Sequence, residues 1–252
     1  MLESLPGCPV CRAAATRHFL NVGGRDYFRC RACEATFLAA SQRPSRQSEY
    51  RHYLSHENEV DDAGYRRFLS KLADPLLERL ERRRSRRPGE RLRGLDYGCG
   101  PGPALAAMLR EAGHEVAVYD PHFEPDTGPL RHTYDFVTCT ETAEHFHRPA
   151  DEFERLDRML EPGGWLAIMT CFQSEDALFA GWHYRKDPTH VVFYRETTLR
   201  RVAALHGWDC EIPLKDVALM FKPESGRMPC TRSRVERSWN PSRRSGGRSG
   251  RE

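Results

Sequence analysis

The sequence lacks the segments that would carry the chain into or across a membrane. No run of about eighteen apolar residues occurs in its 252 residues, so no segment is expected to span a bilayer. The first residues, MLESLPGCPVCR, have neither the basic start nor the apolar stretch of a secretory signal. We therefore expect a cytoplasmic protein with no membrane partner.

The chain also lacks an excess of positive charge outside its C-terminal end. The formal net charge is +3, but residues 222–252 hold nine Lys or Arg and three Glu, which leaves −3 for everything before them. A basic nucleic-acid-binding body is therefore not favoured, although the arginine run at 82–87 and the basic end keep an RNA partner open. Because residues 223–252 are rich in Arg, Ser, Gly and Pro and poor in apolar residues, we expect disorder there.

Cysteine, by contrast, is plentiful, and four of the nine form two C-x-x-C pairs. Eighteen residues separate the pairs, the spacing of a zinc ribbon whose four thiolates hold one tetrahedral ion: Cys8, Cys11, Cys30 and Cys33. Gly23 and Gly24 lie where the connecting hairpin should turn, and Tyr27 and Phe28 should lie on its return strand. Four sulfurs leave no open position, so the zinc is expected to be structural. Unrelated core thiols or a disulfide are the alternative.

The rest of the chain alternates in pattern between strands and helices, which predicts a doubly wound α/β sheet of Rossmann-like type. We expect four parts, a zinc-ribbon-like module (1–40), a helical connector (41–88), a catalytic domain (89–222) and the basic tail (223–252). In the connector, Asp61 or Asp62 caps a helix that Pro75 kinks or divides, and the arginine-rich stretch after Leu80 is predicted to be a solvated helix end. Strands are predicted at 92–97, 115–119, 136–140, 165–171, 208–213 and 217–221, and helices at 103–111, 150–160 and 196–206.

A glycine-rich turn, LDYGCGPG at 95–102, falls where the first of these strands gives way to a helix. Its glycines let the backbone turn tightly and come close to a ligand. Asp120, at the end of the next strand, can accept hydrogen bonds from ribose hydroxyls. The spacing G-x-G-x-G differs from the dinucleotide pattern G-x-G-x-x-G, and the preceding Asp96 would oppose a pyrophosphate but suit a ligand with an ammonium and a sulfonium.

This turn resembles motif I of class I S-adenosylmethionine-dependent methyltransferases, and the stretches YDFVTCTETAEHFHRP at 134–149 and LEPGGWLAIMT at 160–170 resemble later motifs of the same family. The resemblance implies S-adenosylmethionine as cofactor. It implies a cofactor site formed by Asp96, Gly98, Cys99, Gly100, Gly102, Asp120, Thr140 and Glu141. Only thirteen residues separate Asp120 from Tyr134, too few for the usual helix, third strand and adenine loop, so the adenine contact is unassigned, with His122 or Phe123 able to supply it.

Two loops carry the candidate chemistry of the acceptor site. E-T-A-E-H at 141–145 resembles the motif of ubiquinone-biosynthesis O-methyltransferases, which implies a divalent cation at Glu141, Glu144 and His145; the alternative is that Glu144 and His145 only orient the loop. The second loop, GWHYRKDPTHVVFYRETTL at 181–199, resembles bacterial methyltransferases with an N-terminal zinc ribbon. It offers Trp182, His183, Tyr184, Asp187 and His190, with His190 as base or substrate contact. Turn chemistry at Asp187 and a hydrogen-bonded core histidine are the alternatives there.

We predict a methyltransferase that acts on oxygen or carbon of a small molecule. The chain lacks the Asn/Asp-Pro-Pro-aromatic turn usual in methyltransferases of adenine amines or glutamine, since CTETAEHF stands in its place. An rRNA or tRNA methyltransferase that grips RNA with its zinc module is the second hypothesis. An inactive methyltransferase-like binding module is the third. The sequence indicates neither the acceptor nor the oligomeric state.

Overall fold

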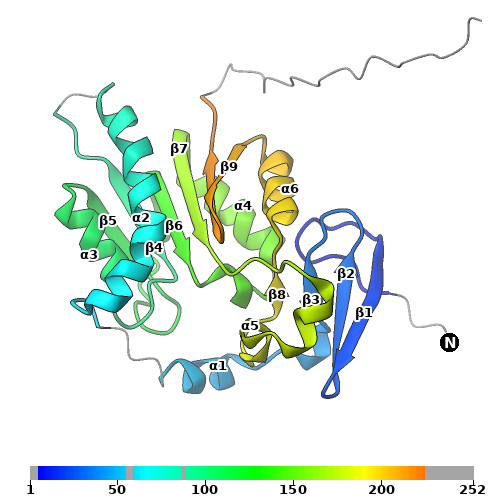
Figure 1. Cartoon of the computed structure of the whole chain (residues 1–252). Helices are drawn as coiled ribbons and strands as arrows, with labels where there is room; N and C mark the ends of the chain where they lie inside the picture. Colours follow the sequence, from blue (N-terminus) through cyan, green and yellow to red (C-terminus); the bar gives the residue numbers. More distant parts are fainter. Residues whose placement is uncertain (1–4, 55–58, 87–88, 225–252) are drawn as a thin grey trace, which may run out of the picture.

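The computed structural model describes residues 5–54, 59–86 and 89–224, which build two sheets and the helices that cover them (Figure 1). The first four residues and the expected C-terminal disorder from residue 225 onward lie outside these ranges. Within the described residues, no helix has both the length and the apolar character needed to cross a membrane.

The central sheet has the strand order β5-β4-β6-β7-β10-β9 and confirms the predicted α/β class. Its strands are β4 (Arg93–Tyr97), β5 (Glu115–Tyr119), β6 (Tyr134–Thr140), β7 (Leu160–Met169), β9 (Asp209–Leu214) and β10 (Val217–Phe221). β4, β5, β6 and β7 pair in parallel, whereas β10 is antiparallel to both of its neighbours. β5 forms one edge of the sheet, because the short segment before β6 holds only the turn η2 (Pro129–Arg131), as the thirteen-residue gap predicted.

Helices cover both faces of this sheet, as the nearly continuous burial along β4 and β6 requires, because successive side chains of a strand point to opposite faces. Val137 and Ile168 point into one core and Phe136 and Ala167 into the other. α2 (Ala63–Arg84) and α3 (Ala104–Glu111) cover the second core, while α4 (Pro149–Met159) and α6 (Glu196–His206) cover the first (Figure 1). The carboxyl ends of β4, β5 and β6 are left to the loops that follow them.

The helix α2 departs from the expectations for the connector at two points, since Pro75 does not divide it and one arginine of its otherwise exposed end is buried. It starts at an Asp62 cap that accepts the Tyr65 N–H at 2.5 Å, and it runs through Pro75 without a division. Arg83, expected in a solvated helix end, is 8% exposed and donates from Nε and Nη2 to Asp135 at 2.9 and 2.7 Å. A guanidinium buried against a carboxylate is a structural pair, so Arg83 is unavailable for RNA contact.

The second sheet begins in the N-terminal cysteine-rich segment and has the order β1-β2-β3-β8. β1 (Thr16–Val22) and β2 (Arg25–Cys30) form the predicted hairpin, with Gly23 and Gly24 at φ 59° and 82° in its turn. β3 (Thr36–Leu38) then pairs with β8 (Val192–Phe193), a strand that lies far along the chain in the loop 181–199. We call β1 to β3 with their four cysteines the four-cysteine module.

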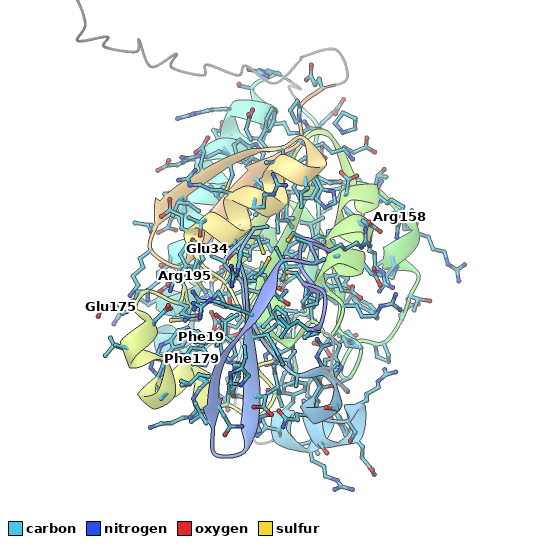
Figure 2. The ribbon with its side chains drawn as sticks, turned by 90° about the vertical axis from the view of Figure 1, so that its right-hand side faces the viewer. Phe19, Glu34, Arg158, Glu175, Phe179 and Arg195 are labelled. Atoms are coloured by element: carbon cyan, nitrogen blue, oxygen red, sulfur yellow. The ribbon has the colours of Figure 1, made fainter. Side chains whose placement is uncertain are left out.

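Aromatic packing joins the four-cysteine module to the segment between β7 and β8. The Phe19 ring of β1 lies against Phe179 with ring centroids 5.3 Å apart, as Figure 2 shows from the module side. Phe179 belongs to the turn η4 (Asp176–Gly181), which leads into the short helix α5 (His183–Lys186). Module and sheet domain thus share one hydrophobic core.

The connector contributes a further helix, α1 (Arg46–Tyr53), after the turn η1 (Ala40–Gln42). Ser45 caps α1 by accepting the Ser48 N–H at 3.2 Å. The Arg46 guanidinium donates to the Pro121 carbonyl oxygen at 2.8 Å, and His147 Nε2 lies 2.8 Å from Glu49 Oε1. α1 therefore lies across the loops at the carboxyl ends of β5 and β6.

Candidate active site

A cavity of about 1010 Å³ opens where the carboxyl ends of β4, β5 and β6 meet α1. This is the edge at which open α/β sheets bind ligands. Most of the residues predicted from sequence for the cofactor and acceptor sites lie around this one space. Those lining it are Gly98, Cys99, Gly100, Asp120, Thr140, Glu141, Glu144, His145, His183, Tyr184, Asp187 and His190.

The glycine turn after β4 forms one wall of the cavity. Gly98 has φ +80° and its N–H donates to the Tyr119 carbonyl oxygen at 2.7 Å; a Cβ here would lie 2.2 Å from Thr142 Cγ2. Gly100 has φ +66°, and a Cβ there would meet nothing within 4 Å. Gly98 is therefore required by the fold, whereas Gly100 keeps the cavity wall free of a side chain.

Asp120 lies at the end of β5 and is held by three backbone N–H groups. Its Oδ1 accepts from His122 and Phe123 at 2.8 and 3.1 Å, and its Oδ2 accepts from Gly100 at 3.1 Å. The carboxylate thus ties the second loop to the glycine turn. Since a carboxylate has about four lone-pair positions, capacity remains for a bound ligand.

Asp96 and Gly102, also expected at the cofactor, lie outside the lining of this cavity. Asp96 is 3% exposed beneath the turn and accepts the Thr138 hydroxyl at 2.7 Å. Burial raises the pKa of Asp96 to about 6, with the Thr138 bond acting against the rise. Asp96 therefore lies behind the residues that border the cavity and is not itself part of its wall.

Thr140 ends β6, Glu141 follows it, and both residues line the same cavity. The buried Thr140 Oγ1 has no hydrogen-bond partner among the described residues, so it has a donor and an acceptor to offer. Glu141 has φ 47°, a left-handed conformation uncommon for a non-glycine residue. Burial and then the nearby charge of Glu144 raise the pKa of Glu141 to about 9. Glu141 is therefore protonated at neutral pH.

The end of the cavity away from the glycine turn is built on Glu144, which belongs to the turn η3 (Ala143–His145) and is fully buried. The Tyr184 hydroxyl donates to its Oε1 at 2.5 Å, and the Thr170 hydroxyl donates to its Oε2 at 3.0 Å. Nε2 of His145 and Nε2 of His190 lie 3.9 and 4.0 Å from Oε1. One buried carboxylate is therefore faced by two hydroxyls and two imidazoles.

The tautomers of both histidines follow from their backbone partners. His190 Nδ1 lies 2.7 Å from the Tyr184 carbonyl oxygen, and His145 Nδ1 lies 3.1 Å from the Thr189 carbonyl oxygen. A carbonyl oxygen only accepts, so each Nδ1 carries the proton and each Nε2 presents a lone pair when the ring is neutral. Burial lowers the pKa of His190, so its neutral form, with a lone pair on Nε2, predominates at pH 7.

Asp187 holds the other side of His190. Its Oδ1 accepts from the Thr189 backbone N–H and hydroxyl at 2.8 and 2.5 Å, and its Oδ2 lies 3.8 Å from His190 Nε2 and 3.1 Å from His52 Nε2. Burial opposes ionisation, but the Thr189 hydrogen bonds and the neighbouring imidazoles of His190 and His52 lower the pKa of Asp187 to about 2. Asp187 therefore combines the predicted turn role with a charge beside the imidazole.

The three residues Glu144, His145 and His190 also match the donor set of a metal site, since their ligand atoms lie within 4.8 Å of one another. The sequence resemblance implied Glu141, Glu144 and His145 instead. Glu141 is not in this group, and His190 from the second loop takes its place.

Several cavity residues had no distinctive signal in the sequence. They come from the helices α1, α2 and α4 and from the ends of β4 and β5: Arg46, Glu49, Tyr53, Tyr65, Tyr97, Tyr119, Glu152 and Arg155. Tyr65 was recognised only as part of the apolar side of a helix. His122 and Phe123 do line the cavity, whereas Trp182 packs away from it against Phe179, Tyr184 and Phe193.

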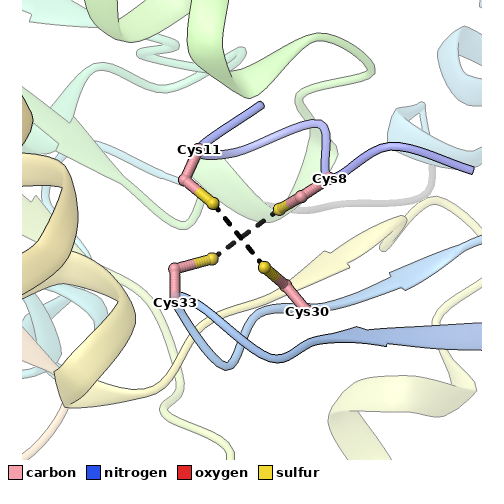
Figure 3. Close-up of side chains that lie close together, drawn as sticks. All are labelled: Cys8, Cys11, Cys30 and Cys33. Atoms are coloured by element: carbon pink, nitrogen blue, oxygen red, sulfur yellow. Dashed lines mark hydrogen bonds between the residues drawn. The ribbon is translucent and has the colours of Figure 1, made fainter. Parts of the chain in front are cut away.

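The four predicted zinc ligands meet at one point outside this cavity. Their sulfur atoms lie within 4.8 Å of one another, with Cys8 Sγ 3.6 Å from Cys33 Sγ and Cys11 Sγ 3.6 Å from Cys30 Sγ (Figure 3). Zn–S bonds of about 2.3 Å in a tetrahedron place sulfurs about 3.8 Å apart, so the geometry fits one zinc ion. No disulfide joins any of the described cysteines.

Comparison with known proteins connects the cavity to a family. The family model described as "Methyltransferase domain" matches residues 64–211. The Ubiquinone biosynthesis O-methyltransferase of Sodalis glossinidius is 29% identical over 147 residues, covering 54% of this chain and 57% of the relative. That of Nitrosospira multiformis is 27% identical over 132 residues, 49% of this chain and 55% of the relative. The chain thus spans little more than half the length of these relatives.

An O-methyltransferase family protein from Burkholderia thailandensis is among the solved structures that are similar to this chain, with a TM-score of 0.46 and 17% identity, covering 73% of this chain and 64% of that chain.

Proposed function

This chain belongs to the methyltransferase domain family, and we propose that it transfers a methyl group from S-adenosylmethionine to an oxygen or carbon of a small-molecule acceptor. The observation that carries the proposal is the joining of two sites in one cavity. A glycine turn fixed to Asp120 lies at one end, and a histidine with a free Nε2 lies at the other.

The residues at the first end fit S-adenosylmethionine. Asp120 would bind the ribose hydroxyls, and the open wall at Gly100 would admit the methionine portion. His122 and Phe123 present ring surface for the adenine, and the unpartnered Thr140 Oγ1 offers a further contact. When bound, S-adenosylmethionine supplies a methyl group on a sulfonium that is already electrophilic, so the protein has to align the acceptor and take its proton.

His190 is our candidate for the group that takes this proton. Its Nδ1–H is fixed on the Tyr184 carbonyl, so the proton from an acceptor hydroxyl would go to Nε2. Asp187 and Glu144, 3.8 and 4.0 Å from that atom, would stabilise the resulting imidazolium. Tyr184 and His145 hold Glu144 in place and complete the acceptor end. The names of the matched relatives favour oxygen as the accepting atom.

The same end of the cavity has a second possible role, which is to bind a divalent cation. Glu144, His145 and His190 present one carboxylate oxygen and two imidazole nitrogens, a donor set that holds Mn²⁺, Fe²⁺ or Zn²⁺. A cation there would orient an acceptor oxygen in place of a free base. Titration of Mn²⁺ into the protein and into Glu144→Gln distinguishes the two uses: saturable binding lost in the variant supports the cation, and no binding supports the base.

Zinc at Cys8, Cys11, Cys30 and Cys33 is proposed as a second, structural component. We assign residues 1–40 to the zinc module, 41–88 to the connector and 89–222 to the catalytic domain. An ion held by four thiolates has no open position, so it takes no part in methyl transfer.

The proposal is tested by incubating the purified protein with methyl-labelled S-adenosylmethionine and a fractionated cell extract. Label in a small-molecule fraction, absent with Asp120→Ala protein, supports it. Label in RNA would instead establish the rRNA or tRNA alternative, and its binding should then weaken steeply with salt. S-adenosylmethionine binding without transfer to any fraction would establish the inactive module.

A further inference from the structure

The segment that carries His190, residues 187–194, is held between two parts of the molecule. On one side lies the four-cysteine module, and on the other lies the η3 turn with Glu144 and His145. The strand β8 within this segment is the fourth strand of the module's own sheet and pairs with β3, beside which it lies in Figure 1.

The module holds the segment through its backbone. Leu38 N–H donates to the Val191 carbonyl oxygen at 2.9 Å, and Phe37 pairs with Val192 in the antiparallel ladder. The Arg25 guanidinium donates to the Pro188 carbonyl oxygen at 2.9 Å. Contacts from β2 and β3 therefore fix the chain on both sides of His190.

The opposite side of the segment bonds to the acceptor end of the cavity. Val191 N–H donates to the Glu144 carbonyl oxygen at 2.9 Å, and the Tyr194 hydroxyl donates to the Ala143 carbonyl oxygen at 2.9 Å. The Thr189 carbonyl oxygen is the acceptor that sets the His145 ring. A shift of this segment would therefore move both histidines relative to Glu144.

The cysteines control where β3 lies. Cys30 ends β2, Cys33 stands in the turn before β3, and Cys30 N–H donates to the Ala35 carbonyl oxygen at 2.9 Å. Three-residue β3 is too short to keep its place without the turn that precedes it. Fixing the thiolates on one ion would fix this turn and hence the strand.

We propose that the four-cysteine module is a positioning element of the acceptor site, in which metal binding at the four thiolates holds β3, and β3 holds His190 in place. The inference rests on the proposed function only for calling this end the acceptor site. The cofactor end is expected to be independent of the module, because the Asp120 bonds run among residues 100–123.

The test is residue-resolved labelling of histidines with diethyl pyrocarbonate, read by peptide mass spectrometry, which needs no acceptor. His190 is 7% exposed and should react slowly in the zinc-loaded protein. Removing zinc with a chelator, or by Cys33→Ser, should raise its rate by about fivefold or more, since protection follows local opening. The labelling rate of His122, at the cofactor end, should change by less than about twofold. Cys210→Ser, a cysteine outside the cluster, is the matched control.

A second pair of variants covers the case in which the zinc-free chain unfolds. Arg25→Ala removes the bond to Pro188 without touching a thiol, and Arg17→Ala removes an arginine whose guanidinium lies over Phe19 of its own strand. We expect His190 to be labelled faster in Arg25→Ala than in the wild type. The labelling rate should return to the wild-type value in Arg25→Lys and should be unchanged in Arg17→Ala.

Unchanged His190 labelling in both the zinc-free protein and Arg25→Ala overturns the proposal. Failure of the protein to bind S-adenosylmethionine would refute the proposed function and leave this labelling result standing, so the two failures are distinguishable.

Discussion

Nε2 of His190 lies 4.0 Å from Oε1 of Glu144, although the two residues belong to different loops of the sheet domain. The same Nε2 lies 3.8 Å from Oδ2 of Asp187. The imidazole is thus neutral by burial yet close to two carboxyl groups that would stabilise its protonated form. This arrangement suits a group that receives a proton during a reaction.

Replacing His190 by Gln should lower methyl transfer far more than cofactor affinity. General-base groups contribute about 10²–10⁴-fold to rate, so the loss in turnover should lie in that range, with the Kd for S-adenosylmethionine within about threefold. Label transfer and calorimetry measure the two quantities. His206→Gln, a histidine stacked on Trp208 outside the cavity, is the control. Equal losses of affinity and turnover would indicate a structural histidine.

Asp120→Ala should weaken S-adenosylmethionine binding by about 10- to 100-fold, because hydrogen bonds to a charged group contribute about 1.5–3 kcal/mol. Calorimetry measures the affinity, and circular dichroism verifies the fold. Asp126→Ala is the matched control, since this exposed residue accepts only the Gly128 N–H in the same loop. Unchanged affinity in Asp120→Ala would remove the ribose assignment.

Purified protein should contain one zinc per chain at the cysteine cluster. Plasma emission spectrometry gives the content, and Cys33→Ser should lose most of this zinc and melt at lower temperature, because metal binding contributes to folding. Cys210→Ser should retain the metal. A preparation that holds no metal and still folds would contradict the zinc assignment.

Glu141→Gln should make stability less sensitive to pH. The pKa of Glu141 is raised from 4.5 to about 9, first by burial and then by the charge of Glu144. The folded chain therefore binds more protons than the unfolded chain in that window, and its stability falls as pH rises through it. In thermal melts at pH 5, 7 and 9, the melting temperature of the variant should rise relative to that of the wild type as the pH increases. Parallel curves, like those expected for the exposed Glu175→Gln, would contradict this cause.

The regular elements could be predicted from sequence because their signals are local. The hydrophobic pattern located β10 and α6 to the residue, and paired cysteines with two glycines located the hairpin. Arg83 was misjudged because its burial depends on Asp135, a partner far along the chain that no local pattern indicates.

The parts of the candidate site that belong to a sequence motif could be predicted. The parts that form only by contact between distant segments could not. The closeness of the glycine turn and Asp120 could be predicted, because each follows one of two neighbouring parallel strands. The sequence placed Glu141 beside Glu144, whereas the structure places His190 there. The position of His190 depends on how the loop 181–199 folds back, which its pairing with β3 of the module controls. α1 gave no functional signal, because a short polar helix looks the same whether or not it covers a cavity.

The most direct test of the account is calorimetric titration of the purified chain with S-adenosylmethionine, alongside NAD. We predict one S-adenosylmethionine site per chain with a Kd of roughly 1–100 µM and no competition from NAD. Binding of NAD in the same cavity, or no binding of S-adenosylmethionine by a folded, zinc-loaded chain, would contradict it.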